Sequence, residues 1–296
     1  MSRKNPKKIV KETKNVNNLI VRSITGALFV IVLVGCIVYN AMTFSLLFAL
    51  ITALSVWEFS TLVNLREDVH VNRMICTVSG VYLFFAVMGF SIHALPSAVF
   101  IPYLLTVIYL LVSELYLQRP NPMNNWAYAF AGQVYVALPF ALMHVLAFRT
   151  VLGTENITYS YIYPLSVFIF LWANDSGAYC FGSMLHKYIP YKLFPRISPN
   201  KSWIGSIGGG VLVVVAAIII AHFYQEQTML EWVGLGLVVS IFGTWGDLVE
   251  SQIKRSLNIK DSGKFLPGHG GLLDRFDSSL LAFPAAVLYL YTITLF

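Results

Sequence analysis

Two pairs of acidic residues near the C-terminal end of the sequence have a spacing that brings their carboxylates together on a helix. The pairs are Asp247 with Glu250, and Asp274 with Asp277. Residues three apart lie on one helix face, and two carboxylates about 4 Å apart repel by about 4 kcal/mol at an effective dielectric constant of about 20. Each pair therefore needs a proton, a basic partner or a cation.

A bound cation and a set of salt bridges both explain this spacing. Mg²⁺ at a nucleotide site takes one or two carboxylates together with water and phosphate oxygens. Salt bridges would instead use the basic residues near the acids in the sequence, namely Lys254, Arg255 and Arg275. Ser251 lies beside the first acidic pair. The spacing of the acids alone does not decide between the two.

The segment KDSGKFLPGHGGLLDRFDSS, residues 260–279, is polar in a chain where only 11% of residues are charged. Four of its glycines allow the backbone to approach a ligand closely: Gly263, Gly268, Gly270 and Gly271. Its positive charge, which suits phosphate groups, comes from Lys260, Lys264, His269 and Arg275. Acids, glycines and basic side chains in one loop favour the cation, so we predict a combined phosphate and Mg²⁺ site.

Two other segments carry polar residues that would join such a site. ISPNKSWIGSIGGG supplies Ser198 and Lys201 just before a predicted helix N-terminus, where an anion can bind. LWANDSGAYCFG places Asp175 on one helix face with Trp172. A charged residue inside a bilayer costs about 2.5–3.5 kcal/mol on insertion scales, so Asp175 calls for a functional explanation.

Membrane-spanning helices must position these residues, because 57% of the 296 residues are hydrophobic, more than in an ordinary soluble domain. About 20 apolar residues in a helix cross the hydrocarbon core of a bilayer. The sequence predicts an all-α polytopic membrane protein with about nine transmembrane helices. They are expected near residues 23–39, 41–63, 74–94, 97–117, 127–148, 161–182, 206–224, 231–250 and 278–296.

The distribution of Lys and Arg predicts how these helices are oriented, since both residues prefer the cytoplasmic side. Nine alternating spans with a cytoplasmic N-terminus put 19 of the 20 Lys and Arg residues inside and only Arg149 outside. We therefore expect a multi-pass protein of the cell (inner) membrane, with an uncleaved first span and a site that faces the cytoplasm. The expected regions are a basic segment 1–22, five spans in 23–150, and a catalytic region 151–296 with cytoplasmic loops 183–205 and 251–277.

Other polar residues also fall within the predicted spans. Four acids lie in the halves towards the cytoplasm: Glu58, Glu114, Asp175 and Asp247. For Glu58 and Glu114 the sequence leaves open a paired, a snorkelling and a functional role. Three histidines lie near the opposite ends, where a partly wet imidazole would be structural: His93, His144 and His222.

The cysteines indicate neither a disulfide framework nor a zinc site. Cys36, Cys76 and Cys180 all fall in predicted spans and form no CxxC pair. The sequence also lacks a GxxxxGK[ST] phosphate loop. No nucleic-acid partner is expected.

The run SQIKRSLNIKDSGKFLPGHGGLLDRFD, residues 251–277, resembles the signature of the phosphatidate cytidylyltransferases, also called CDP-diacylglycerol synthases. The matching elements are a Ser, Lys-Arg, Lys-Asp, a Gly, Pro-Gly-His-Gly-Gly and Asp-Arg-x-Asp. AYxFG at 178–182 and SPxKxW at 198–203 extend the resemblance towards the N-terminus. Three positions depart from it: Ser202 replaces the usual Thr, Ile204 stands where the family has Glu, and His186 stands where the family more often has Gly.

The resemblance implies that the phosphate of phosphatidic acid attacks the α-phosphorus of CTP, giving CDP-diacylglycerol and pyrophosphate, with one or two Mg²⁺ ions. It implies Asp247 and Asp274 as metal ligands, and helical spacing adds Glu250 and Asp277. Catalytic roles are expected for Asp247, Asp274, Lys254 and His269. Substrate binding is expected from Ser198, Lys201, Ser251, Arg255, Lys260, Arg275 and Asp175. The resemblance also implies a homodimer within the lipid bilayer.

Two other functions remain as alternatives. Another CTP-dependent membrane lipid enzyme, such as a polyprenol kinase or an ether-lipid cytidylyltransferase, would share the metal and nucleotide chemistry but use a different acceptor. An ion-coupled transporter is disfavoured because the acids lie towards one side of the membrane and the sequence shows no internal repeat.

Overall fold

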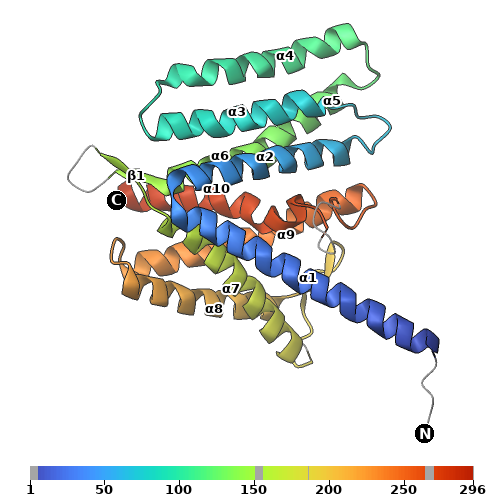
Figure 1. Cartoon of the computed structure of the whole chain (residues 1–296), viewed down its shortest axis with the longest axis vertical. Helices are drawn as coiled ribbons and strands as arrows, with labels where there is room; N and C mark the ends of the chain where they lie inside the picture. The colour runs from blue at the N-terminus through green and yellow to red at the C-terminus, as the bar shows by residue number, and fades with distance from the viewer. Residues whose placement is uncertain (1–5, 151–155, 186, 264–269, 296) are drawn as a thin grey trace.

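The computed structural model describes residues 6–150, 156–185, 187–263 and 270–295, and for residues 6–22 and 294–295 the backbone alone. Helices dominate it (Figure 1). The first half contains α1 (Pro6–Tyr39), α2 (Ala41–Val63), α3 (Arg73–Ser91), α4 (Ile101–Leu117), α5 (Pro122–Ala131) and α6 (Leu138–Ala147). A 3₁₀ turn (Ser97–Phe100) leads into α4, and a π-helical turn (Gly132–Ala137) joins α5 to α6. The second half contains α7 (Ile162–Leu185), α8 (Trp203–Phe223), α9 (Met229–Ser256) and α10 (Leu273–Leu295).

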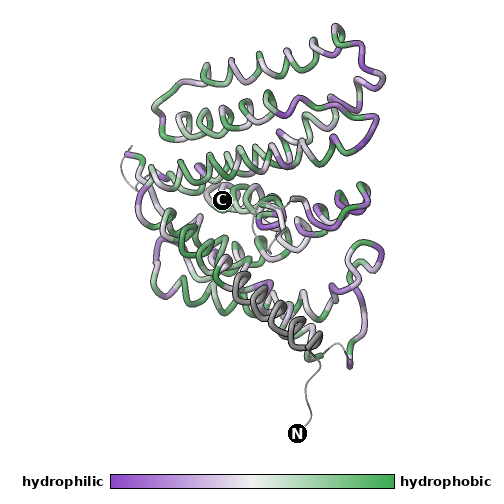
Figure 2. The backbone as a smooth tube through the Cα atoms, turned by 45° about the vertical axis from the view of Figure 1, so that its right-hand side comes forward, coloured by the Kyte–Doolittle hydropathy of each residue, from purple (hydrophilic) through white to green (hydrophobic). Residues whose placement is uncertain are grey.

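Within the described residues, seven helical segments are long and apolar enough to cross a membrane. They confirm the all-α polytopic membrane fold, and Figure 2 shows hydrophobic residues along the helices with hydrophilic residues gathered near their ends and in the loops. The apolar part of α1, Ser23–Tyr39, is shorter than these segments, and α7 carries the polar residues Asn174 and Asp175 near its middle. The count of nine spans and the cytoplasmic N-terminus stay predictions.

Two short antiparallel ribbons were not expected from the sequence. β1 (Phe148–Thr150) pairs with β2 (Ile157–Tyr159), and β3 (Lys192–Phe194) pairs with β4 (Ser198–Ser202). The second ribbon lies in the predicted loop 183–205 and runs directly into α8. Ser202 ends β4 and caps α8, because its hydroxyl accepts a hydrogen bond of 3.2 Å from the Gly205 N–H.

The helices form a layered bundle in which α10 lies between α2–α6 on one side and α7–α9 on the other, and α1 lies on the side of α7 (Figure 1). α10 packs on α9 and α7 from the second half, and on α6 and α2 from the first. Phe276 of α10 is the centre of this packing, since its ring contacts Phe29, Phe48, Phe140 and Phe168 at centroid distances of 5.8, 6.4, 5.4 and 6.1 Å. The residue that follows Phe276 is Asp277, so the aromatic core fixes the acidic end of α10.

His144 of α6 corrects one expectation. Its ring is fully buried, with Phe84 and Phe44 at centroid distances of 4.3 and 5.6 Å. The prediction that this imidazole is partly wet is wrong, because α6 lies inside the bundle, where α3, α7 and α10 pack on it. His93 and His222 are exposed, as expected.

Candidate active site

α9 and α10 cross closely at the point where each helix carries its acidic pair, so the two pairs lie side by side. Gly246, which precedes Asp247, lies against the backbone of Asp277 and Ser278. A Cβ atom at position 246 would be 2.6 Å from the carbonyl oxygen of Asp277, closer than Cβ atoms approach. Only glycine permits this approach, so the crossing joins acids that lie 27 residues apart in the sequence.

A cavity of about 380 Å³ lies at this crossing. Four carboxylates from three helices line it: Asp175 of α7, Asp247 of α9, and Asp274 and Asp277 of α10. Arg275 adds a positive charge to the lining, and Trp172 forms part of the apolar wall. The structure thus places together five charged residues that the sequence predicted for one site.

The N-terminal half also contributes to this cavity, which the sequence did not predict. Thr25 and Gly26 of α1 line it together with Phe29 and Val30. In the sequence these residues belong to an apolar run with no polar motif, and the family signature does not reach them. These α1 residues reach the site because α1 packs against α7 and because Phe29 packs on Phe276 of α10.

Lys201 provides the basic partner of Asp247. Its Nζ lies 2.6 Å from Asp247 Oδ2 and donates a longer hydrogen bond, 3.3 Å, to the carbonyl oxygen of Thr244. The hydroxyl of Ser251 donates to Asp247 Oδ1 over 3.2 Å. The β3–β4 ribbon therefore positions a cation from one loop against a carboxylate of α9.

Lys254 joins the two acidic pairs. Its Nζ lies 2.7 Å from Asp274 Oδ1 and also forms an ion pair with Glu250. The side chain of Lys254 is 13% exposed and that of Glu250 only 1%. Of the three ways to stabilise the acids, the structure contains basic partners for Asp247, Glu250 and Asp274.

Asp274 is held by the loop that precedes α10. Its Oδ2 accepts hydrogen bonds from the backbone N–H groups of Ser262 and Gly271, at 2.8 and 2.9 Å. Gly270, between them in the sequence, has a φ of 86°, and a Cβ there would lie 2.8 Å from Asp274 Oδ2. Glycine at this position lets the backbone come close to the Asp274 carboxylate, and the approach of this loop to a ligand stays a prediction.

Glu58 of α2 supports the same loop from the other half of the molecule. Its Oε2 accepts a hydrogen bond of 2.8 Å from the N–H of Leu273, the first residue of α10. A carboxylate at this position accepts a hydrogen bond from an N–H group that has no partner within the helix, and its negative charge is attracted to the positive end of the helix dipole. Glu114 differs, because it pairs with Arg119 at 3.1 Å and accepts from Asn125 at 2.8 Å, where α4 meets α5.

The remaining predicted site residues either do not line the cavity or lie outside the described residues. Arg255 donates to the carbonyl oxygen of Ile259 over 3.2 Å at the end of α9, and Lys260 is exposed on the turn that follows. Ser198 is half-buried in β4 opposite Phe194. Lys264, Gly268 and His269 lie outside the described residues. Roles for Ser198, Arg255, Lys260 and His269 stay predictions.

The acids around the cavity provide the kind of donor that Mg²⁺ prefers, since all of them are carboxylates. In the part of the chain that the structure describes, however, no group of three or more His, Cys, Asp or Glu is close enough together to hold a metal ion. Lysines pair with Asp247 and Asp274. The donor set fits Mg²⁺ in its chemistry, and binding would require these lysines to move away.

The chain is similar in sequence to one protein family and to several bacterial enzymes. A family described as "Cytidylyltransferase family" matches residues 20–293. Phosphatidate cytidylyltransferases of Staphylococcus aureus and Staphylococcus haemolyticus are 47% and 45% identical over 124 residues. Each alignment covers 41% of this chain and 46% of the relative, so the chain spans about half the length of the curated relatives it matches.

Proposed function

Because the chain belongs to the cytidylyltransferase family, we propose that it transfers CMP from CTP to phosphatidic acid, giving CDP-diacylglycerol and pyrophosphate. The observation that carries this proposal is the cavity at the α9–α10 crossing, where Asp274, Arg275 and Asp277 of the signature segment line one space with Asp175 and Asp247. The acceptor is named from the phosphatidate cytidylyltransferases, to which the chain is similar.

The reaction asks the protein mainly for positioning and charge neutralisation. The phosphate of phosphatidic acid is already anionic near neutral pH, so it needs little help from a general base. Holding two anionic reactants together requires positive charge that is in place before they meet. Lys201 and Lys254 have this role in our proposal, with Arg275 at the rim of the cavity.

In our proposal the lysine–carboxylate pairs offset part of the negative charge at the cavity before nucleotide enters. Lys201 faces Asp247, and Lys254 faces Asp274 and Glu250. In our proposal both lysines turn to phosphate oxygens when CTP binds, which frees the carboxylates. Asp247, Asp274 and Asp277 would then hold Mg²⁺, with Glu250 close behind, and the ion would neutralise charge on the transferred phosphoryl group.

The location follows from the substrates. CTP is soluble in the cytoplasm and the acyl chains of phosphatidic acid stay in the bilayer, so a cavity near one membrane face reaches both. We therefore propose an inner-membrane protein whose N-terminus and site face the cytoplasm, as the Lys and Arg distribution predicts. A homodimer remains the expected assembly.

The deciding experiment is an assay of purified protein with CTP, Mg²⁺ and phosphatidic acid, followed by identification of both products. CDP-diacylglycerol and pyrophosphate in equal amounts support the proposal. CDP together with a newly phosphorylated alcohol would show a lipid kinase instead. Turnover with an ether-linked acceptor and none with phosphatidic acid would show the other cytidylyltransferase.

A further inference from the structure

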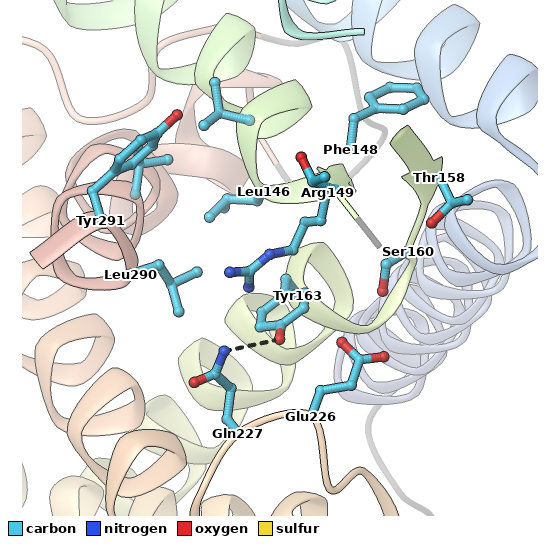
Figure 3. Close-up of a pocket in the computed structure, with 13 residues that line it drawn as sticks. Leu146, Phe148, Arg149, Thr158, Ser160, Tyr163, Glu226, Gln227, Leu290 and Tyr291 are labelled. Carbon is cyan, nitrogen blue, oxygen red and sulfur yellow. Dashed lines mark hydrogen bonds between the residues drawn. The ribbon is translucent and has the colours of Figure 1, made fainter. Parts of the chain in front are cut away.

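A second cavity, about 610 Å³ in volume, lies at the opposite ends of α9 and α10 (Figure 3). Its walls come from the end of α6, the β1–β2 ribbon, the start of α7, the α8–α9 turn and the end of α10. Leu290 of this cavity follows Asp274 by sixteen residues on α10. At about 1.5 Å per residue these two residues are about 24 Å apart along the helix. The nearest lining residues of the two cavities on α10, Ser279 and Val287, are about 12 Å apart, so this space is separate from the acidic cavity.

One side of the second cavity suits an apolar chain. Four aliphatic residues line it: Val145, Leu146, Val287 and Leu290. Tyr291 also lines the cavity and is 58% exposed, and its neighbour Leu288 is 68% exposed on the outside of α10. The apolar wall therefore continues onto a surface of the kind that transmembrane helices present to lipid tails.

Arg149 brings a positive charge into this cavity. Its guanidinium carbon lies 4.2 Å from the centre of the Tyr163 ring, a cation–π contact that fixes the group. Nη1 of Arg149 is buried and has no hydrogen-bond partner among the described residues. A buried guanidinium N–H group normally has an acceptor, and a phosphate oxygen matches its geometry and charge.

Glu226 brings a negative charge from the facing side. Figure 3 shows Glu226 and Gln227 entering from the α8–α9 turn, opposite the strand that carries Arg149. Gln227 donates a hydrogen bond of 3.4 Å to the hydroxyl of Tyr163, which ties this turn to α7. In the described part of the chain, Glu226 and Arg149 form no ion pair with each other.

We propose that this cavity binds one phospholipid whose headgroup carries both a phosphate and a primary ammonium group. The phosphate accepts from Arg149, the ammonium group donates to Glu226, and an acyl chain lies along the wall that includes Leu146 and Leu290. A headgroup with negative charge alone would leave Glu226 facing a like charge, which is unfavourable. A free phosphate would leave the apolar wall unused.

Native mass spectrometry of the full chain in detergent tests this proposal, with one phospholipid added at a time. The probes are dioleoyl phosphatidylethanolamine, phosphatidylcholine and phosphatidylglycerol, which share the same acyl chains. We expect one retained phosphatidylethanolamine and at least about tenfold weaker retention of phosphatidylglycerol, the factor that corresponds to about 1.4 kcal/mol. Phosphatidylcholine, which has no ammonium N–H to donate, is expected between them.

Two variants separate the two charges. Glu226→Gln should reduce phosphatidylethanolamine retention to the level of phosphatidylglycerol, and Arg149→Gln should weaken retention of every phospholipid. Gln225→Ala, at an exposed neighbour on the same turn, is the matched control and should change nothing. If Arg149→Gln fails to elute as a single species in gel filtration, Arg149→Lys and Glu226→Gln decide the result. Equal retention of all three lipids, or retention unaffected by Glu226→Gln, would overturn the proposal.

Discussion

The two ends of α10 differ in how the charged side chains around them are paired. At its start, Asp274 is paired with Lys254 and two backbone N–H groups, and Asp247 across the crossing is paired with Lys201. At its other end, Arg149 and Glu226 share a cavity without pairing with each other. At the first end, two of the four cavity carboxylates are paired with lysines, so the proposed ligand would have to exchange partners with them, whereas at the second end the proposed headgroup would not have to separate an Arg149–Glu226 ion pair.

The lysines at the first end offset the cost of placing several carboxylates in one cavity. Pairing at the acidic cavity permits several acids to lie together, because each nearby lysine offsets a carboxylate that would be costly alone. The same lysines match the charge of a triphosphate. If the proposed reactant binds here, the cavity is stabilised before it arrives, and variants of the lysines and acids measure how strongly stability and turnover are coupled.

The largest expected effect comes from Lys254→Met, which removes the cation shared by Asp274 and Glu250. Breaking a buried ion pair by deleting one partner costs about 3–5 kcal/mol, and Glu250 is almost fully buried. We expect a loss of this size in unfolding free energy, measured by denaturant unfolding in micelles. Lys254→Met combined with Glu250→Gln should recover part of the loss. An unchanged unfolding free energy in the single variant would show that the pairs do not stabilise this end of α10.

Asp247→Asn and Asp274→Asn should each reduce CTP-dependent turnover by about 10²–10³-fold, the size seen when one electrostatic contact at a reacting centre is removed. Both variants keep the shape of the side chain, so the protein should elute in gel filtration as the parent does. Asp68→Asn is the control, because Asp68 pairs with Arg66 in the turn between α2 and α3, outside the cavity. Substantial turnover by either site variant would refute its role as a metal ligand.

Gly246→Ala tests whether the crossing itself is needed. An added methyl group meets the backbone of Asp277 and Ser278, which cannot rotate away, and overpacking of this kind costs about 1–3 kcal/mol. We expect a fall in both melting temperature and turnover. Gly210→Ala, in the middle of α8, is the control, since a Cβ atom there would meet nothing within 4 Å. Equal effects of the two variants would show that the acidic end of the crossing has no special demand for glycine.

The sequence predicted the parts of the site that depend on local spacing. Helical periodicity put Asp247 with Glu250 and Asp274 with Asp277, and the signature segment joined them to Lys254. It could not predict the contact of Glu58 with Leu273, because these residues are 215 positions apart and hydrophobicity alone does not choose which helices pack together. For the same reason the sequence did not predict that Thr25 and Gly26 line the acidic cavity. The β3–β4 ribbon was missed because strands of three and five residues carry little periodic signal.

The smallest expected effect concerns that long-range contact. Glu58→Gln keeps an oxygen that can accept from the Leu273 N–H but removes the charge at the α10 N-terminus. A hydrogen bond to a charged group contributes about 1 kcal/mol more than a neutral one, so we expect a loss of about this size in unfolding free energy. Glu67→Gln, on the exposed turn after α2, should leave stability unchanged. If Glu58→Gln is also unchanged, the charge of Glu58 does not stabilise the start of α10, and the first half holds this end only through the aromatic packing around Phe276.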